Sequence, residues 1–208
     1  MSAYRKTDAL AGFAQHLTSM GYHVLASSGT KSFLDTRGII SHDVTSAVGA
    51  PILGHRVVTL SREIFASILA RRGSEEDSME LKRLGLAPIE LVYVDFYPLL
   101  DAILDPSTTE EEIIEKIDIG GPTLLRAAAK AERIAVPSEE WFPLAQQAAA
   151  VPIAMANTIA IGTIRKLAYE SEQAVARYSA LTATFYEKVF YGTLEEWRTE
   201  QRAARERQ

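Results

Sequence analysis

Apolar positions over the first two thirds of the chain change repeatedly between helical and strand-like spacing. Helical spacing predicts helices over Thr7 to Met20, Thr108 to Lys116 and Leu124 to Lys130. Continuous apolar and β-branched runs predict buried strands over Tyr22 to Ala26, over Ile89 to Phe96, and in a segment that ends at Val136. This alternation indicates an α/β fold whose sheet is mainly parallel.

The pattern changes beyond Pro137, where strand signals stop. Ala154 to Val189 is alanine-rich with apolar residues at helical spacing, which predicts a helical arm that packs on the sheet or on a second copy. Its tyrosines are expected to pack as core rings rather than to stack on bases: Tyr169, Tyr178, Tyr186. From Glu195 onward a solvated, frayed helix is expected. We therefore expect an α/β core over 1–136 and a helical extension over 137–208.

Composition narrows the class of protein. The chain has 208 residues, 47% of them hydrophobic, which is enough for one sizeable core. A formal net charge of -5 disfavours nucleic-acid binding through a basic surface. The first residues are too polar for a secretory signal, and no apolar run is long enough to cross a bilayer. We therefore expect a cytoplasmic protein that binds neither nucleic acid nor membrane.

The sequence gives no support for metal or thiol chemistry. It has no cysteine, which excludes a thiol nucleophile, a thiolate zinc site and an iron–sulfur cluster. The histidines show neither an HExxH pattern nor an i, i+4 pairing with a carboxylate: His16, His23, His42, His55. We therefore expect a site without a metal ion.

A short polar loop is the first candidate for ligand binding. Ser27, Ser28, Gly29 and Thr30 follow a predicted strand and open a helical segment. Backbone N–H groups, hydroxyls and the helix dipole at such a position can hold a phosphate. An ordinary helix N-cap explains the same residues, so the residues alone leave both interpretations open.

A second candidate surrounds Asp118. Paired glycines at Gly120 and Gly121 let the backbone approach a ligand closely, and Pro122 is favourable in a first helical turn. Asp118 lies beside this helix entrance, where it could act in catalysis or simply cap the turn that follows.

The run that contains Asp118 carries a family resemblance. Ile117 to Lys130 reads IDIGGPTLLRAAAK and resembles the signature of the IMP cyclohydrolase domain of the bifunctional purine-biosynthesis AICAR transformylase/IMP cyclohydrolase. Further segments resemble the family in chain order: Lys6–Thr7, Ala26–Thr30, Gly49–Pro51, Gly54–Val57, Ile68–Arg71 and Asp95–Pro98. The resemblance implies a methylglyoxal synthase-like, doubly wound fold that forms one domain over 1–208, with no transformylase domain.

The same resemblance implies a ring closure that needs no cofactor. The carboxamide nitrogen of a formamido-imidazole-carboxamide ribotide (FAICAR) attacks the formyl carbonyl, and water leaves to give IMP. Asp118, Tyr97 and Lys130 match the family's catalytic positions. Asp118 suits the proton acceptor, and Tyr97 or Lys130 suits a donor to the formyl oxygen. A homodimer and a separate formyltransferase are also implied.

The other matching positions are expected to bind this small ribonucleotide. Ser27 to Thr30 would hold its phosphate, and the N–H groups of Gly120 and Gly121 would stabilise the developing oxyanion. The expected substrate- and phosphate-binding residues are Lys6, Thr7, Ser27, Ser28, Gly29, Thr30, Arg56, Asp95, Ile119, Gly120 and Gly121.

Several positions beside the expected site depart from the family pattern. Val58 and Ser61 stand where the family has a lysine and a histidine. Asp95 stands where Asn is usual, and Arg5 where an Asp usually precedes the lysine. These changes leave two alternatives to IMP formation. One is a diverged cyclohydrolase that acts on a related phosphoribosyl carboxamide, for example in nucleoside-antibiotic biosynthesis, and the other is a non-catalytic nucleotide-binding module.

Overall fold

Parallel strands form the centre of the molecule. The computed structural model describes residues 1–151 and 158–207. Its strands are short: β1 (Ser2–Ala3), β2 (Leu25–Ala26), β3 (His42–Asp43), β4 (Leu91–Asp95) and β5 (Ile134–Val136). β1 pairs with β4, β4 with β5 and β2 with β3, all in parallel. The Met1 amino group donates to Leu25 O (2.6 Å) and Ser27 N–H donates to Met1 O (3.0 Å), which gives the order β3-β2-β1-β4-β5.

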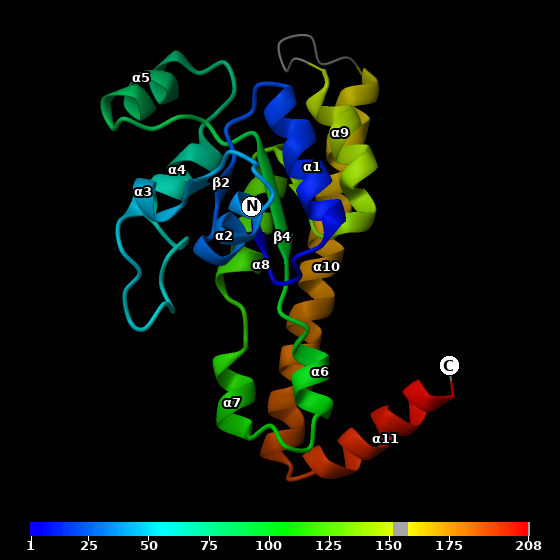
Figure 1. The fold of residues 1–208 in the computed structure, drawn as a ribbon. Coiled ribbons are helices and arrows are strands. Elements are labelled where there is room, and N and C mark those ends of the chain that lie inside the picture. Colours follow the sequence, from blue (N-terminus) through cyan, green and yellow to red (C-terminus); the bar gives the residue numbers. More distant parts are fainter. Residues whose placement is uncertain (152–157, 208) are drawn as a thin grey trace.

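Helices cover both faces of these strands (Figure 1). They are α1 (Asp8–Ser19), α2 (Ser28–Asp35), α3 (Thr45–Val48), α4 (Arg62–Leu69), α5 (Glu75–Arg83), α6 (Leu99–Leu104), α7 (Glu110–Glu115), α8 (Gly120–Lys130), a 3-10 turn (Glu139–Trp141), α9 (Phe142–Ala149), α10 (Thr158–Phe190) and α11 (Leu194–Glu206). α1 and α9 pack on one face around Tyr93, and α4 and α8 pack on the other around Val92 and Val94. The predicted α/β fold with a mainly parallel sheet is therefore confirmed.

Local sequence signals place several element ends correctly. Thr7 caps α1 by accepting a hydrogen bond from Leu10 N–H (3.1 Å), as the predicted helix start requires. The strand expected from Tyr22 is shorter and begins only at Leu25. α7 begins after Thr109, which forms a capping box with Glu112, rather than at the expected Thr108. α8 begins at Gly120, earlier than the predicted start at Leu124, so the signature run is helical from its first glycine onward.

The long helix α10 confirms the predicted helical arm over the residues that the structure describes. It spans Thr158–Phe190, and the expected positions 154–157 lie outside the described residues. Tyr178 is a core ring as expected, packed with α6, α7 and α11 residues. Tyr169 and Tyr186 remain largely exposed in the single copy. Within the described ranges, no helix combines the length and apolarity needed to cross a membrane.

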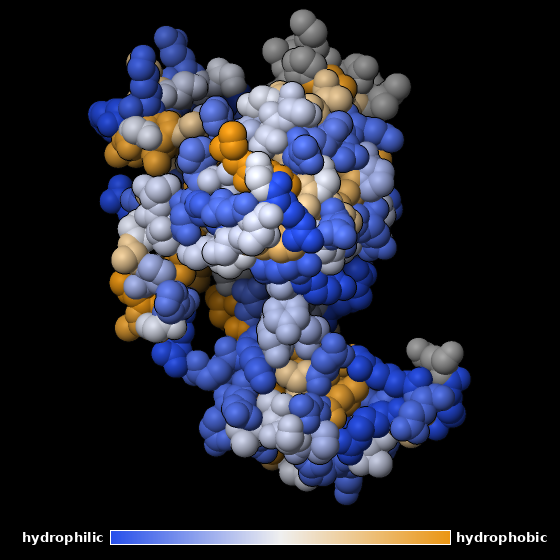
Figure 2. All heavy atoms as spheres, viewed as in Figure 1, coloured by the Kyte–Doolittle hydropathy of each residue, from blue (hydrophilic) through white to orange (hydrophobic). Residues whose placement is uncertain are grey.

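The C-terminal segment is a largely exposed helix, as expected, but one of its side chains is anchored in the core rather than solvated. α11 folds back below the sheet beside α6, with hydrophilic residues over much of its outer surface (Figures 1 and 2). Arg198 is only 4% exposed, donating from Nε to Ile103 O (2.6 Å) and from Nη2 to Thr108 O (2.9 Å). A hydropathy pattern treats every arginine as an exposed polar residue. It therefore could not predict that Arg198 is buried and donates hydrogen bonds to carbonyl groups in α6 and before α7.

Candidate active site

The carboxyl ends of the parallel strands bring the predicted site segments to one edge of the sheet. The register pairs Ala3 with Asp95, so the residues after β1 lie beside those after β4. The Ser27 to Met1 hydrogen bond places the loop after β2 next to them. Open α/β sheets bind their ligands at this edge. The entrance of α8 packs against β4 at the same place, because Gly121 approaches Val94 closely.

Asp118 is fixed at the entrance of α8 by the paired glycines. Its Oδ1 accepts a hydrogen bond from Gly121 N–H (2.8 Å), which confirms the capping interpretation. A Cβ at Gly121 would overlap Asp118 Oδ2 and would lie 2.8 Å from Val94 Cγ1, so only glycine fits. A Cβ at Gly120 would lie 3.1 Å from Thr59 Oγ1, which places Thr59 beside the same turn. The sequence reasoning missed Thr59 as a site residue.

The surroundings of Asp118 favour its protonated form more than water does. Burial raises the pKa of its carboxyl group, while hydrogen bonds from Gly121 and Gly120 N–H act in the opposite direction. Its own N–H donates to the hydroxyl oxygen of Tyr178 on α10 (2.8 Å). A carboxylate with a raised pKa suits proton transfer near neutral pH.

The predicted role of the two glycine N–H groups changes in this geometry. Both N–H groups already face the Asp118 carboxylate. They therefore stabilise the charge of Asp118 itself, and the expectation that they serve a substrate oxyanion does not match the structure. Donors for such an oxygen have to come from other side chains.

A pocket of about 670 Å³, a size typical of small-molecule sites, lies beside the residues that follow β1 and β4, and Asp118 is not among the residues that line it. Tyr97 and Tyr178 both line it, so the Tyr178 hydroxyl links its wall to Asp118. The Tyr97 ring meets Tyr4 edge-on at 4.8 Å between centroids. Lys116 Nζ lies 5.9 Å from the centroid of Tyr97. Lys116 was not predicted, and it supplies a cation inside the candidate site.

Two of the departures from the family pattern form one ion pair. Arg5 donates from its main-chain N–H (2.7 Å) and from Nη2 (2.5 Å) to the carboxylate of Asp95. Asp95 is 6% exposed, and the pairing raises the pKa of Arg5. The negative charge that Asp95 adds relative to the usual Asn is therefore neutralised by Arg5. The pair lines the pocket, so Asp95 faces the site already paired to Arg5.

The loop after β2 leads directly into α2, the position that the predicted phosphate site requires. Ser27 precedes the first residue of α2, and its hydroxyl donates to Thr30 Oγ1 (3.0 Å). Thr30 is fully buried, and its Oγ1 accepts from Ala3 N–H (3.1 Å), which ties the loop to β1. Ser28 and Gly29 are exposed in the first turn of α2, where backbone N–H groups lack partners within the helix.

The residues after β1 serve mainly to hold the chain in place. Thr7 caps α1 and its hydroxyl also donates to Glu139 Oε1. Lys6 Nζ donates to Ala3 O and Tyr4 O, and burial lowers the pKa of this amine, partly offset by Asp95.

Arg56 and Lys130 lie away from the other predicted residues. Arg56 Nη2 donates to Glu115 Oε2 (2.8 Å) of α7, and both side chains are exposed. Lys130 is exposed at the last turn of α8, which begins beside Asp118. An α-helix of this length separates its ends by about 16 Å. One copy of the chain therefore does not bring Lys130 to Asp118.

The positions that lost the family lysine and histidine have structural roles here. Val58 packs against the cluster formed by α4, α8 and β4. Ser61 caps α4 by accepting from Ile64 N–H (3.2 Å). Across the part of the chain that the structure describes, no group of three or more His, Asp or Glu side chains is placed to hold a metal ion.

Comparisons with known proteins agree with the resemblance seen at residues 117–130. The chain is 37% identical over 191 residues to the bifunctional purine biosynthesis protein PurH of Lactobacillus acidophilus, covering 90% of this chain and 36% of that protein. It is 49% identical over 111 residues to PurH of Thermosynechococcus vestitus, covering 53% of this chain and 21% of that protein. The chain thus spans about a third or less of the length of these curated relatives.

A solved structure and a family model define the fold. The crystal structure of ForH superposes with a TM-score of 0.72 at 27% identity, covering 89% of this chain and 96% of that one. The model of the MGS-like domain matches residues 9–123, which include the Ser27 loop, Tyr97 and Asp118. The chain therefore belongs to the MGS-like domain family.

Proposed function

We propose that this chain is a cyclohydrolase that closes the ring of FAICAR to IMP with loss of water. The observation that carries the proposal is Asp118, a half-buried carboxylate with a raised pKa at the carboxyl edge of the sheet. The relatives named PurH support a place in purine biosynthesis. A chain of this kind acts as a single domain, takes an already formylated ribonucleotide from a separate formyltransferase, and uses no cofactor.

The proposed chemistry assigns one proton transfer to Asp118. The carboxamide nitrogen attacks the formyl carbon, a C–N bond forms, and Asp118 accepts the proton that leaves the nitrogen. The formyl oxygen gains negative charge, and Tyr97 and Lys116 are the donors placed on the pocket wall to stabilise it. That oxygen takes back the proton held by Asp118 to give a carbinol, and it leaves as water when it takes a second proton as the same nitrogen loses its remaining hydrogen and the ring becomes aromatic. The first turn of α2, at Ser28 and Gly29, holds the phosphate of the ribotide.

A second candidate is ring closure on a related phosphoribosyl carboxamide. The ion pair between exposed Arg5 and buried Asp95 on the pocket wall favours it, because this pair presents a different set of donors and acceptors from Asp and Asn. Val58 packs into the core and Ser61 caps α4. The lysine and the histidine that the family has at these two positions are therefore missing from the site.

The test is turnover of purified protein with FAICAR, followed by the ultraviolet absorbance of IMP. We expect IMP to form at a rate that depends linearly on protein concentration. Faster turnover of another carboxamide ribotide than of FAICAR would assign the second candidate. Binding of a ribotide by calorimetry with no turnover of either, and with unchanged affinity in Asp118→Asn, would mean a nucleotide-binding module and would refute both cyclohydrolase proposals.

Lys130 can act only in a site shared between two copies. We expect Asp118→Asn and Lys130→Ala homodimers to be nearly inactive separately, and their reassorted mixture to regain about a quarter of the wild-type activity. The reason is that half of the dimers are mixed, and one of the two sites in each mixed dimer has both Asp118 and Lys130. Activity is measured after mild unfolding and joint refolding, with each variant refolded alone as the control. No recovery in the mixture would remove Lys130 from the catalytic set.

A further inference from the structure

Tyr178 reaches the candidate site from the middle of the long helix α10. It is 9% exposed, and its ring packs among apolar residues of α6, α7 and α11. The ring of Phe96, in the segment that follows β4, lies 5.0 Å away between centroids. Because the ring is held on several sides, the hydroxyl group at its tip has a defined place.

This hydroxyl group stands between Asp118 and the pocket. Its oxygen accepts the hydrogen bond from Asp118 N–H (2.8 Å), and Tyr178 also lines the pocket of about 670 Å³. A phenol has one hydrogen to donate as well as lone pairs that accept. Among the residues that the structure describes, no acceptor takes this hydrogen. The hydroxyl can therefore donate to a ligand while it holds the main chain of Asp118.

The two side chains have opposite hydrogen-bonding roles. Burial raises the pKa of Tyr178, the hydrogen bond from Asp118 N–H acts in the opposite direction, and the charge of Asp118 raises it further. The phenol therefore keeps its proton at neutral pH and can donate it in a hydrogen bond. The carboxylate of Asp118, once ionised, can only accept.

A donor beside an acceptor is complementary to a primary carboxamide. Such a group presents N–H donors and a carbonyl acceptor on the two sides of one carbon atom. Asp118 can accept from the amide nitrogen while Tyr178 donates to the amide oxygen of the same group. A carboxylate in its place would meet Asp118 with like charge, and an ester would offer Asp118 no N–H.

We propose that Tyr178 is a further catalytic residue, which donates its O–H to the carboxamide oxygen of the substrate while its oxygen fixes Asp118 beside the amide nitrogen. This role rests on the ring closure proposed above. When Asp118 takes a proton from the nitrogen, negative charge is shared between the nitrogen and the amide oxygen, where the hydroxyl donates. The N–H becomes more acidic, which helps a weak nucleophile to attack the formyl carbon.

The first test replaces Tyr178 with Phe in the full chain. Phenylalanine keeps the ring and removes only the hydroxyl, so the melting temperature should change by less than about 6 °C. With FAICAR we expect kcat to fall roughly 10²-fold, because the lost donor acts where charge develops. KM should rise at most about tenfold, as one neutral hydrogen bond to the bound amide is lost.

A double-variant cycle separates this role from a structural one. The charge on the amide oxygen develops only when Asp118 removes the proton. In an Asp118→Asn background, Tyr178→Phe should therefore lower the residual kcat by less than about 3-fold. A structural role would give the same loss in both backgrounds.

Binding of an unreactive carboxamide separates this role from the proposed reaction. Aminoimidazole carboxamide ribotide carries the amide but no formyl group, so it binds without closing a ring. By calorimetry we expect Tyr178→Phe to weaken its affinity about 3- to 10-fold.

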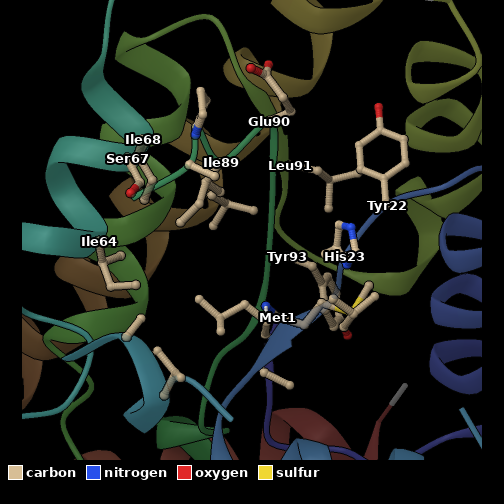
Figure 3. A pocket seen from close by; sticks show the side chains of 18 of the residues that line it. Met1, Tyr22, His23, Ile64, Ser67, Ile68, Ile89, Glu90, Leu91 and Tyr93 are labelled. Atoms are coloured by element: carbon tan, nitrogen blue, oxygen red, sulfur yellow. Dashed lines mark hydrogen bonds between the residues drawn. The ribbon is translucent and has the colours of Figure 1, made fainter. Parts of the chain in front are cut away.

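Tyr22→Phe is the matched control. The Tyr22 hydroxyl also bonds a main-chain group, donating to Ala149 O (3.3 Å), and the residue precedes β2, at the edge of the sheet opposite the site. Figure 3 shows Tyr22 among the side chains that line a second cavity, of about 560 Å³, with its hydroxyl pointing away from His23 and Met1. We expect this variant to keep the wild-type kcat and affinity.

The results distinguish the role of Tyr178 from the ring closure itself. If FAICAR is turned over and Tyr178→Phe keeps the wild-type kcat and affinity, the role of Tyr178 is refuted and the ring closure stands. If FAICAR is not turned over but the carboxamide ribotide binds more weakly to Tyr178→Phe, the contact with the amide is supported and the ring closure is refuted. Equal losses of kcat in both backgrounds, or no binding of the carboxamide ribotide by the wild type, would overturn the role of Tyr178.

Discussion

Replacing Asp118 with Asn is expected to lower the rate of ring closure about 10²- to 10⁴-fold without unfolding the protein. An Asn side-chain oxygen can still accept the Gly121 N–H bond, so the entrance of α8 is preserved. It cannot accept a proton, so the attacking nitrogen loses its base. Steady-state IMP formation measures the effect on kcat, and circular dichroism confirms the fold.

The pH dependence gives an independent signature of the same carboxylate. Because burial raises the pKa of Asp118, we expect the rate to fall with decreasing pH already above the range in which ordinary carboxyl groups titrate. In Asp118→Asn that decline should be absent from the residual rate. Since the folded-state pKa is raised, the folded protein binds this proton more tightly than the unfolded chain, and stability falls as pH rises through the pKa. The melting temperature of Asp118→Asn at pH 7 should therefore not decrease.

A matched carboxylate far from the site serves as the control. Glu80 lies exposed on α5, in a weak contact with Arg83 (3.7 Å). Glu80→Gln should leave the rate and its pH profile unchanged. If Asp118→Asn retained more than about a tenth of the wild-type rate, Asp118 would not be the base, given the usual size of such losses.

The parts of this structure that follow from local signals were predictable from the sequence. The helix start at Thr7 and the capping role of Asp118 depend on residues within three positions of each other. The central strand β4 follows from a β-branched and aromatic run between prolines. The order of the strands, and with it the meeting of the predicted segments at one edge, agrees with the fold that the resemblance implied.

Contacts between distant residues account for what the sequence could not predict. Tyr178 reaches Asp118 across 60 positions, and helical spacing on α10 indicates only that such a ring is buried. Arg5 and Asp95 were each noticed as departures, but their pairing appears only when β1 lies beside β4. Lys130 was placed in the site by its match to the family, and the length of α8 separates it from Asp118 within one copy.

Replacing Arg133 with Met is expected to destabilise the fold by about 3–5 kcal/mol. Arg133 is 1% exposed, and its Nε and Nη2 donate to Ile68 O (3.0 Å) and Ala70 O (2.6 Å) at the end of α4. Its Nη1 also donates to both carboxylate oxygens of Glu90 (2.8 Å each). Methionine fills a similar volume but leaves buried carbonyl groups without donors. Thermal unfolding should show a melting temperature lower by roughly 6–20 °C.

The cause of this loss can be separated into two contributions with matched variants. Arg126→Met removes an exposed arginine from α8 whose contact with Glu172 is 3.4 Å, and should cost less than about 1 kcal/mol. In Arg133→Met the Glu90 carboxylate loses one of its two arginine partners but keeps Arg72 at 3.0 Å. Its partly unpaired charge therefore accounts for only part of the loss of stability. Adding Glu90→Gln to Arg133→Met should recover that part, while the loss due to the carbonyls of Ile68 and Ala70 remains. A double variant as stable as the wild type would assign the whole effect to the ion pair. Equal losses in Arg133→Met and Arg126→Met would contradict the role of burial altogether.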